Sequence, residues 1–298
     1  MPSVTVRVPA KVNLVLSVGP RRPDGFHEVA TVYHAVSLFD EIVASAAGDV
    51  TVTVEGTMAE TVPVDEHNLA VKAAQMLAAY AGVTTGARLL VRKGIPVAGG
   101  MAGGSADAAA ALVACDALWG TGLGRAELSI LAARLGSDVA FGLVGGTALG
   151  AGRGERLTPV MVGGSFDWVL AIAEHGLSTP EVYAELDRQR GRSVPHPAVQ
   201  PDVLAALRAG DAEALGAALD NDLEPAARTL APELGTTLEA GLGLGALGAV
   251  VSGSGPTCAF LVRDAKHALD LSMGLAAAEV CSDVRRATGP VPGARVVA

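Results

Sequence analysis

Apolar and polar residues alternate with a period of two at the start of the chain. Valine occupies every second position of 4–8, and after Pro9 the alternation resumes over 12–18. This period predicts β-strands, in which successive side chains point to opposite faces. Lys11 and Asn13 then share the polar face, about 7 Å apart at a spacing of two strand residues.

The rest of the first half mixes strands and helices without regular alternation. The pattern predicts, in order, a turn at 21–25, a strand at 49–55, a helix at 65–80 ended by Gly82, a strand at 87–92, an alanine-rich helix from Ser105 to about 119, and a helix at 125–135 with Gly136 as its C-cap. The glycine-rich segment 139–152 has no charged residue. We therefore expect it to be buried and closely packed.

The second half begins again with an apolar strand. The pattern predicts this strand at 168–173, helices at about 180–190, 202–209, 211–219 and 233–242, a proline-rich loop at 190–201, and two strands, 248–251 and 257–262, around a tight glycine turn. We place a domain boundary near Gly163-Gly164, which divides the chain into 1–162 and 163–298. The mixture of elements in both halves favours an α+β architecture.

Composition narrows the class of protein. At about 100–200 residues per domain, 298 residues suit two domains, and 50% hydrophobic residues exclude a disordered chain. The net charge of −9 argues against a nucleic acid or an anionic membrane as partner. A phosphate would therefore need a local binding device rather than a basic surface.

Cysteines and termini indicate a reduced, cytoplasmic protein. Cys115, Cys258 and Cys281 are odd in number and far apart, so neither a disulfide scaffold nor a CxxC zinc site is expected. The first ten residues lack the pattern of a signal peptide. The charge-free window 240–262 contains six glycines and Pro256, which would break a membrane-spanning helix.

Several common nucleotide-binding motifs are missing. No lysine stands in a Gly-Lys-Ser/Thr sequence, which excludes a Walker A loop, and no histidine is followed by Arg-Asp, as in protein kinases. One GxGxxG motif exists at Gly243, Gly245 and Gly248. It follows a predicted helix and precedes a strand, the reverse of a dinucleotide site. We interpret it as a tight connection.

The strongest local signal is a glycine-rich loop before a helix. Small residues let backbone N–H groups approach an anion, and a helix start adds unpaired donors and partial positive charge. Ser105 would either cap the helix or offer its hydroxyl to Mg²⁺. The alternative is a flexible loop before an ordinary Ser-capped helix. The candidate phosphate-binding residues are Pro96, Val97, Ala98, Gly99, Gly100, Met101, Ala102, Gly103, Gly104, Ser105 and Ala106.

Three segments together resemble one family. They are PAKVNL at 9–14, PVAGGMAGGSADAA at 96–109 and SGSGPTCAF at 252–260, and they are similar to motifs of the GHMP kinases, small-molecule kinases without a Walker A loop. The segments 22–40, 135–155 and 177–186 narrow the resemblance to members that phosphorylate a diphosphocytidyl methylerythritol.

The resemblance implies a fold and an activity. An N-terminal ATP-binding domain and a C-terminal substrate domain would enclose a cleft. The γ-phosphate of ATP would pass, with Mg²⁺, to the 2-hydroxyl of 4-diphosphocytidyl-2-C-methyl-D-erythritol, in non-mevalonate isoprenoid synthesis. The partners would be small molecules only, and the protein a monomer or weak homodimer.

The resemblance also implies catalytic roles. Asp138 matches the catalytic base and Lys11 the residue that steers the hydroxyl and pairs with this base. Taken alone, 136–138 could simply start a helix, and Lys11 could lie on a solvated strand face. A helix N-terminus and a nearby lysine would both favour an ionised carboxylate.

Further matches concern the two substrates. Phe26 and Tyr183 match aromatics that sandwich cytosine, although many members have tyrosine at position 26. His27 would hydrogen-bond the edge of the base. The remaining matches are Asn13, Thr179 and Pro180 in the substrate site and Asn68 and Lys93 near the adenine. In isolation, Phe26 and His27 would more simply be core or surface residues.

One departure and two rival functions remain open. Met101-Ala102 replaces a more usual Leu-Gly pair, and alanine tolerates fewer backbone angles than glycine. The first rival is a GHMP kinase for mevalonate-type, homoserine or sugar substrates. The second is a non-catalytic nucleotide-binding protein, against which the presence of Lys11 and Asp138 argues.

Overall fold

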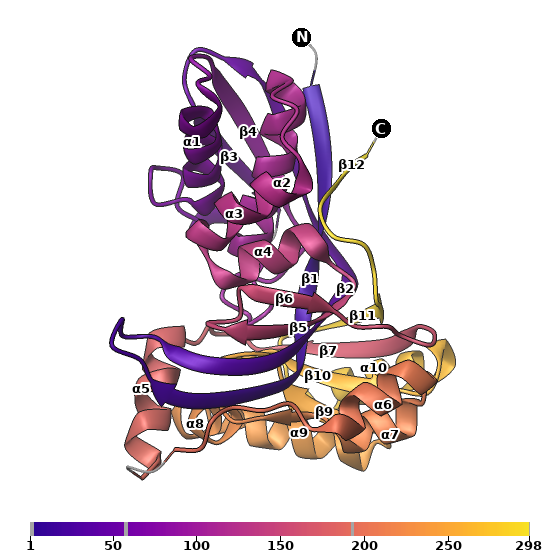
Figure 1. Ribbon diagram of the computed structural model, residues 1–298. Helices are drawn as coiled ribbons and strands as arrows, with labels where there is room; N and C mark the ends of the chain where they lie inside the picture. The colour runs from indigo at the N-terminus through magenta and orange to yellow at the C-terminus, as the bar shows by residue number, and fades with distance from the viewer. Residues whose placement is uncertain (1–2, 57–58, 192–193, 298) are drawn as a thin grey trace.

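The structure, a computed structural model, describes residues 3–56, 59–191 and 194–297. Within them, strands form one sheet of eight strands and a second of four. Figure 1 shows two lobes, with α1–α4 in one and α5–α10 in the other. The expected α+β class is confirmed.

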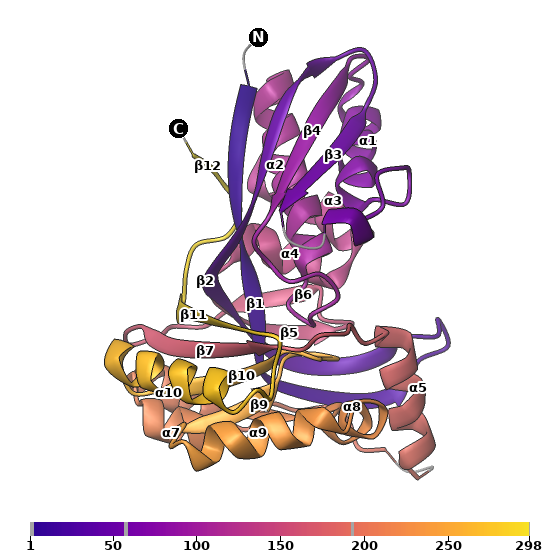
Figure 2. The same ribbon diagram turned by 180° about the vertical axis from the view of Figure 1, so that it is seen from behind.

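A long antiparallel hairpin runs through both lobes. β1 (Ser3–Arg21) pairs with β2 (His27–Ala47) along nearly its whole length. Figures 1 and 2 show these strands passing from the N-terminal lobe to α5 of the other lobe. The register between β1 and β2 shifts between Pro9 and Ala10. This irregularity lets the strand accommodate Pro9, which has no backbone N–H to donate.

The first sheet is built around this hairpin. Its order is β12-β1-β2-β4-β3, with β5 beside β2, β6 beside β5 and β8 beside β1. The further strands are β3 (Thr51–Gly56), β4 (Gly86–Lys93), β5 (Thr147–Gly152), β6 (Arg156–Pro159), β8 (Asp220–Asn221) and β12 (Arg295–Val297). The helices of this lobe are the short 3₁₀ helix η1 (Ala59–Thr61), α1 (Leu69–Ala81), α2 (Gly103–Trp119), α3 (Arg125–Leu135) and α4 (Ser137–Val144).

The second sheet has the order β11-β7-β10-β9, and all its pairs are antiparallel. Its strands are β7 (Phe166–Ile172), β9 (Gly248–Val251), β10 (Cys258–Val262) and β11 (Asp283–Gly289). The helices of this lobe are α5 (Thr179–Gln189), α6 (Pro201–Ala209), α7 (Ala212–Ala217), α8 (Glu224–Leu230), α9 (Glu233–Gly243) and α10 (Ala265–Ala277). Figures 1 and 2 show α9 and α10 running along this sheet.

Helix α2 is the central helix of the first lobe. Residues 108–112, four alanines and a leucine, are fully buried. Small side chains let α2 and α4 pack closely. At their contact, Gly142 of α4 faces Ala109 of α2, and a Cβ added at Gly142 would lie only 2.8 Å from the Cβ of Ala109. Burial on several sides fixes the helix, and with it the position of its first turn.

Most sequence-predicted elements exist, with shifted ends. The turn before residue 26, the αL cap at Gly82 and the hairpin of β9 and β10 are confirmed. Helix α1 begins at Leu69, later than predicted, because the Asn68 side chain accepts a hydrogen bond from Ala70 N and caps it. Among the elements that the sequence pattern did not predict are β2, β5, β6, β11, β12, α8 and α10.

The chain passes from the first sheet to the second between β6 and β7. The division at 162/163 stays a prediction, and β8 and β12 return from the second half to pair with β1.

None of the described helices combines the length and hydropathy that a membrane span requires.

His34 lies where the two sheets meet. Its Nδ1 is 2.8 Å from Thr147 Oγ1 on β5, and its ring lies 5.9 Å from the Trp168 ring of β7. The residue is fully buried, and burial lowers the pKa of His34 to about 4. Unfolding therefore allows this imidazole to take up a proton below about pH 6.5.

We expect stability to fall on acidification through His34. A histidine with a depressed native pKa contributes stability above its unfolded pKa and loses it as pH falls toward the native value. The loss between pH 7 and pH 5 should be about 2 kcal/mol. Urea unfolding of the parent and of His34→Asn at both pH values measures it. Equal pH dependence in the two proteins would contradict the assignment.

Candidate active site

A cavity of about 690 Å³ lies where the two lobes meet. Its walls come from β1, the turn before β2, the glycine loop, the start of α4, the start of α5 and the loop between β9 and β10. It brings together most of the residues predicted from the sequence. These are Lys11, Asn13, Phe26, His27, Ala98, Gly99, Gly100, Ala102, Gly103, Gly104, Ser105, Asp138, Thr179, Pro180 and Tyr183.

The glycine loop has a conformation that suits anion binding. Ala98, Gly100 and Ala102 have positive φ angles of 53°, 72° and 60°. Helix α2 begins at Gly103, two residues before the predicted start, and Ala102 provides no side-chain cap. Ser105 is therefore not the cap, which corrects one alternative from the sequence. The first N–H groups of α2 are available to a ligand.

The loop is held in place by contacts from the β9–β10 loop of the other lobe. Ser252 Oγ donates to Gly100 O at 3.2 Å, and Thr257 N donates to Gly99 O at 3.3 Å. A Cβ at Gly100 would lie 2.2 Å from Ser252 O, so only glycine fits. Met101 is fully buried. Pro96, Val97, Met101 and Ala106 support the loop without lining the cavity.

Lys11 and Asn13 lie side by side on β1, as predicted. Lys11 Nζ donates to Asn13 Oδ1, and Asn13 Nδ2 donates to Thr31 Oγ1 at 2.8 Å. A Cβ at Gly253 would lie 2.8 Å from Lys11 Nζ, so the β9–β10 loop packs directly on the ammonium. Burial lowers the pKa of Lys11, while the charge of Asp138 opposes this shift.

Asp138 borders the cavity from the first turn of α4. The expected ion pair with Lys11 is not formed among the described residues, because Asn13 is the nearer partner. The two charges nevertheless interact across the cavity. Both charged groups thus line the same cavity without pairing directly.

Tyr33 is a site residue that the sequence did not reveal. Its ring stacks on Phe141 at 4.9 Å, and it lines the cavity from β2. Burial, the charge of Asp138 and a hydrogen bond to this carboxylate raise the pKa of Tyr33 well above its usual value. Tyr33 therefore lies close to Asp138 and stays neutral. Tyr33 lies in the segment 22–40 that narrowed the family resemblance, but the sequence motifs assigned it no role.

Aromatic residues line the far end of the cavity. Phe26 is 55% exposed, and the Arg153 guanidinium lies 4.9 Å from its ring centroid. His27 is buried, and its ring centroid lies 5.0 Å from that of Tyr183. His27 Nε2 is 2.8 Å from Asp187 Oδ1, a partner that the sequence motifs did not include. Its position four residues after Tyr183 on a helix could have indicated it.

Thr179 joins α5 to the loop that packs on Lys11. Its Oγ1 lies 2.8 Å from Ser254 Oγ. Asn221 holds the same loop from below, since its Nδ2 donates to Val251 O and Gly253 O, each at 2.7 Å. The polar contacts of Asn221 come from a region that matched no motif.

Two predicted adenine contacts lie elsewhere in the described structure. Asn68 caps α1 and donates to Pro63 O at 2.7 Å. Lys93 is buried between Asp40 and Asp107. Neither side chain lines the cavity.

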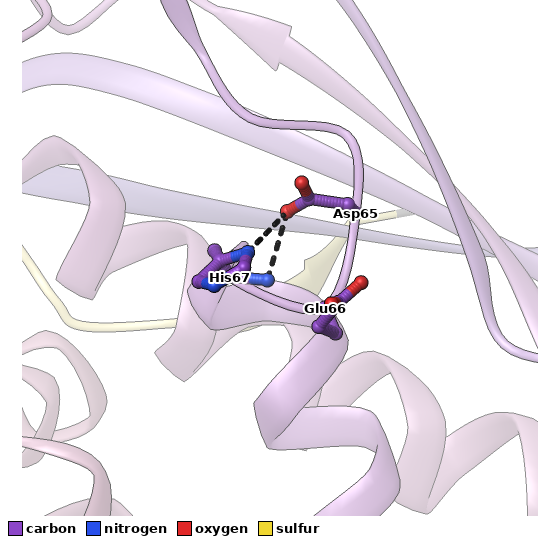
Figure 3. Close-up of side chains that lie close together, drawn as sticks. All are labelled: Asp65, Glu66 and His67. Atoms are coloured by element: carbon purple, nitrogen blue, oxygen red, sulfur yellow. Dashed lines mark hydrogen bonds and ion pairs between the residues drawn. The ribbon is translucent and has the colours of Figure 1, made fainter.

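Figure 3 shows a group of metal-ligating residue types at the approach to α1. Asp65 Oδ1 accepts hydrogen bonds from the backbone and the ring of His67, at 2.9 and 3.1 Å. Asp65, Glu66 and His67 are all exposed. This is the geometry of a turn leading into a helix.

Comparison with known proteins agrees with this geometry. The family model of the GHMP kinases N terminal domain matches residues 68–148, and that of the GHMP kinases C terminal matches 203–272. A 4-diphosphocytidyl-2-C-methyl-D-erythritol kinase of Thermobifida fusca (strain YX) is 57% identical over 303 residues, covering 99% of this chain and 98% of its own. The chain belongs to this family of GHMP kinases.

Other relatives support the assignment of the family. The kinase of the same name from Streptomyces coelicolor is 58% identical over 297 residues, which cover 99% of each chain. A crystal structure of 4-(cytidine 5'-diphospho)-2C-methyl-D-erythritol kinase superposes with a TM-score of 0.78 at 33% identity, covering 95% of this chain and 98% of the other. A homoserine kinase of Cytophaga hutchinsonii has the same TM-score at 21% identity and shows the fold alone. The chain is thus an ATP-dependent kinase.

We expect Ala102→Gly to stabilise this kinase. A left-handed conformation costs a non-glycine residue about 1–2 kcal/mol, which exceeds the extra unfolded-state entropy of glycine. The net gain should be about 0.5–1 kcal/mol in urea unfolding. Ala79→Gly, at an exposed position in α1, is the control and should lose about 1 kcal/mol. A loss at both positions would contradict the strain at Ala102.

Proposed function

We propose that this chain transfers the γ-phosphate of ATP to the 2-hydroxyl of 4-diphosphocytidyl-2-C-methyl-D-erythritol, giving the 2-phosphate and ADP in non-mevalonate isoprenoid synthesis. One observation carries the proposal: a single cavity contains the glycine loop, Lys11 with Asp138, and the aromatic end. The near-full-length relatives bear the name of this activity. We assign ATP binding to 1–162 and the acceptor substrate to 163–298 together with the β1–β2 hairpin, in a cytoplasmic monomer or weak homodimer.

The loop and the start of α2 would hold the phosphates of ATP. Backbone N–H groups at the N-terminus of α2 supply donors and partial positive charge without a local exposed lysine. The first turn of this helix has no acidic residue that would repel a phosphate. Positioning and electrostatic stabilisation account for most of the catalysis of phosphoryl transfer.

Asp138 would accept the proton of the attacking hydroxyl. The hydroxyl oxygen bonds to the γ-phosphorus while the bond from this phosphorus to the bridging oxygen of ADP breaks. Lys11, whose charge interacts with that of Asp138, would stabilise negative charge on the reacting oxygens, and Tyr33 lies close to the carboxylate.

Mg²⁺ belongs to this proposal as well. Ser105 lines the cavity on the first turn of α2, and its hydroxyl has no hydrogen-bond partner among the described residues. A hydroxyl oxygen is a ligand that Mg²⁺ accepts, alongside phosphate oxygens and water. Ser105 would hold the ion, which when bound would neutralise phosphate charge.

Recognition of cytosine would fall to Phe26, His27 and Tyr183. Asp187 fixes the ring of His27, so its other nitrogen has a defined direction. Phe26 has an exposed face for stacking, and it lacks the hydroxyl that a tyrosine would carry. Asn13, Thr179 and Pro180 also line the cavity and would complete the substrate site.

The rivals differ in the acceptor that they require. A mevalonate or homoserine kinase has no use for a cytosine pocket, and a non-catalytic protein releases no ADP. We expect ADP release with the diphosphocytidyl substrate, measured beside mevalonate and homoserine. A higher kcat/KM with either of the last two would overturn the proposed acceptor.

Asp138→Asn should abolish most phosphoryl transfer and leave ATP bound. The amide keeps the shape but does not accept the proton, and a positioned base contributes roughly 10²–10⁴-fold. Stopped ADP release together with an unchanged Kd for ATP is the expected result. A kcat within threefold of the parent would remove Asp138 from this role.

Loss of either aromatic ring should weaken binding of the cytidine substrate. Stacking on a base is worth about 1–3 kcal/mol, so Phe26→Ala or Tyr183→Ala should raise its Kd roughly 10–100-fold. Phe26→Tyr keeps the ring face and is the matched control. Calorimetry with this substrate and with ATP separates the two pockets. Loss of ATP affinity alone would reverse their assignment.

A further inference from the structure

Three charged side chains form a buried cluster beneath the glycine loop. Lys93 of β4, Asp40 of β2 and Asp107 of α2 are each less than 10% exposed. Lys93 Nζ donates to Asp40 Oδ2 and, at 2.8 Å, to Asp107 Oδ2. The cluster therefore joins the two central strands of the sheet to the helix that begins at the loop.

Asp40 also holds the backbone that leads into the loop. Its Oδ1 accepts hydrogen bonds from Gly94 N and Ile95 N, at 2.7 and 2.8 Å. The fully buried carboxylate thus satisfies two donors where β4 ends. The entry to the glycine loop is tied to the same three charges.

The ammonium of Lys93 lies directly behind the start of α2. A Cβ added at Gly103 would lie 3.2 Å from Lys93 Nζ and 3.3 Å from Ile95 Cγ2. Gly103, Gly104 and Ser105 line the cavity, whereas Lys93 does not. Lys93 therefore lies against the side of residues 103–105 that faces away from the cavity. The side of these residues that faces the cavity would hold the phosphates.

The cluster holds two carboxyl groups for one ammonium. Burial, followed by repulsion from Asp40, raises the pKa of Asp107 to about 8 in spite of Lys93. The pKa of Lys93 is raised, since the two carboxyl groups together outweigh its burial. With a proton on Asp107, the cluster has no net charge. It then supports the loop without adding negative charge behind the phosphates.

We propose that Lys93 is a positioning residue for the phosphates of ATP, acting from behind through the first turn of α2, and that its side chain does not contact the adenine. The proposal rests on the assignment of the glycine loop as the ATP phosphate site. It does not depend on which alcohol is the acceptor, so its test remains valid with any acceptor substrate.

The test must remove the ammonium without leaving two buried carboxyl groups face to face. Lys93→Met/Asp40→Asn does this, since the amide introduced at position 40 retains an acceptor oxygen for the two backbone donors. Asp40→Asn alone keeps the pair of Lys93 and Asp107 and is the matched reference. Lys266→Met, at an exposed site on α10, controls for a change of net charge. Thermal unfolding first establishes that each variant is folded.

Comparing the affinities for ADP and adenosine then shows whether a variant affects binding of the phosphates or of the adenine. Relative to Asp40→Asn, the double variant should bind ADP at least tenfold more weakly and adenosine equally well, by calorimetry. Its KM for ATP should rise by more than its kcat falls. Equal losses for ADP and adenosine would indicate an adenine contact, and no loss for either would indicate a structural role only. Both results would overturn the proposal.

A second variant, Lys93→Arg, tests the proposal if the double variant does not fold. Lys93→Arg keeps the positive charge but changes its size and position behind Gly103. It should weaken ADP binding and spare adenosine binding. Unchanged ADP affinity in a folded Lys93→Arg protein would likewise count against the positioning role.

Discussion

The backbone of the glycine loop packs against the backbone of residues 252–255, and the cavity depends on this contact between the lobes. No side chain fits between Gly100 and Ser252 O, and hydrogen bonds from Ser252 and Thr257 hold the loop. The same segment presses Gly253 onto Lys11. One interface thus positions the backbone of the glycine loop and the ammonium of Lys11 together.

Buried charge in this protein is concentrated around that interface. Lys11 lies in front of the glycine loop and Lys93 behind it, and each has a polar side chain as its immediate partner. Buried charges are costly unless they are paired and hydrogen-bonded. Among the described residues, such charges lie at the cavity, as Lys11 does, or beside the start of α2, as Lys93 does.

The sequence predicted local features well where one residue type determines the backbone. Gly82 ends α1 and the glycines at 253 and 255 form the turn between β9 and β10, because positive φ angles favour glycine. The strand β2 was missed, since polar residues such as His34 and Asp40 interrupt its apolar pattern. Both are fully buried, and their partners come from β4, β5 and the second sheet. A periodicity argument has no access to such partners.

The sequence by itself determined the family, the α+β class and the identity of half of the residues that line the cavity, because these are carried by motifs short enough to be recognised locally. Only the tertiary structure decided which groups meet. It pairs Lys11 with Asn13 rather than Asp138, places Tyr33 close to Asp138, and buries Lys93 behind the loop. These outcomes depend on distances between elements far apart in the chain. Such distances are set by the packing of β1, β2 and α2, which no local pattern encodes.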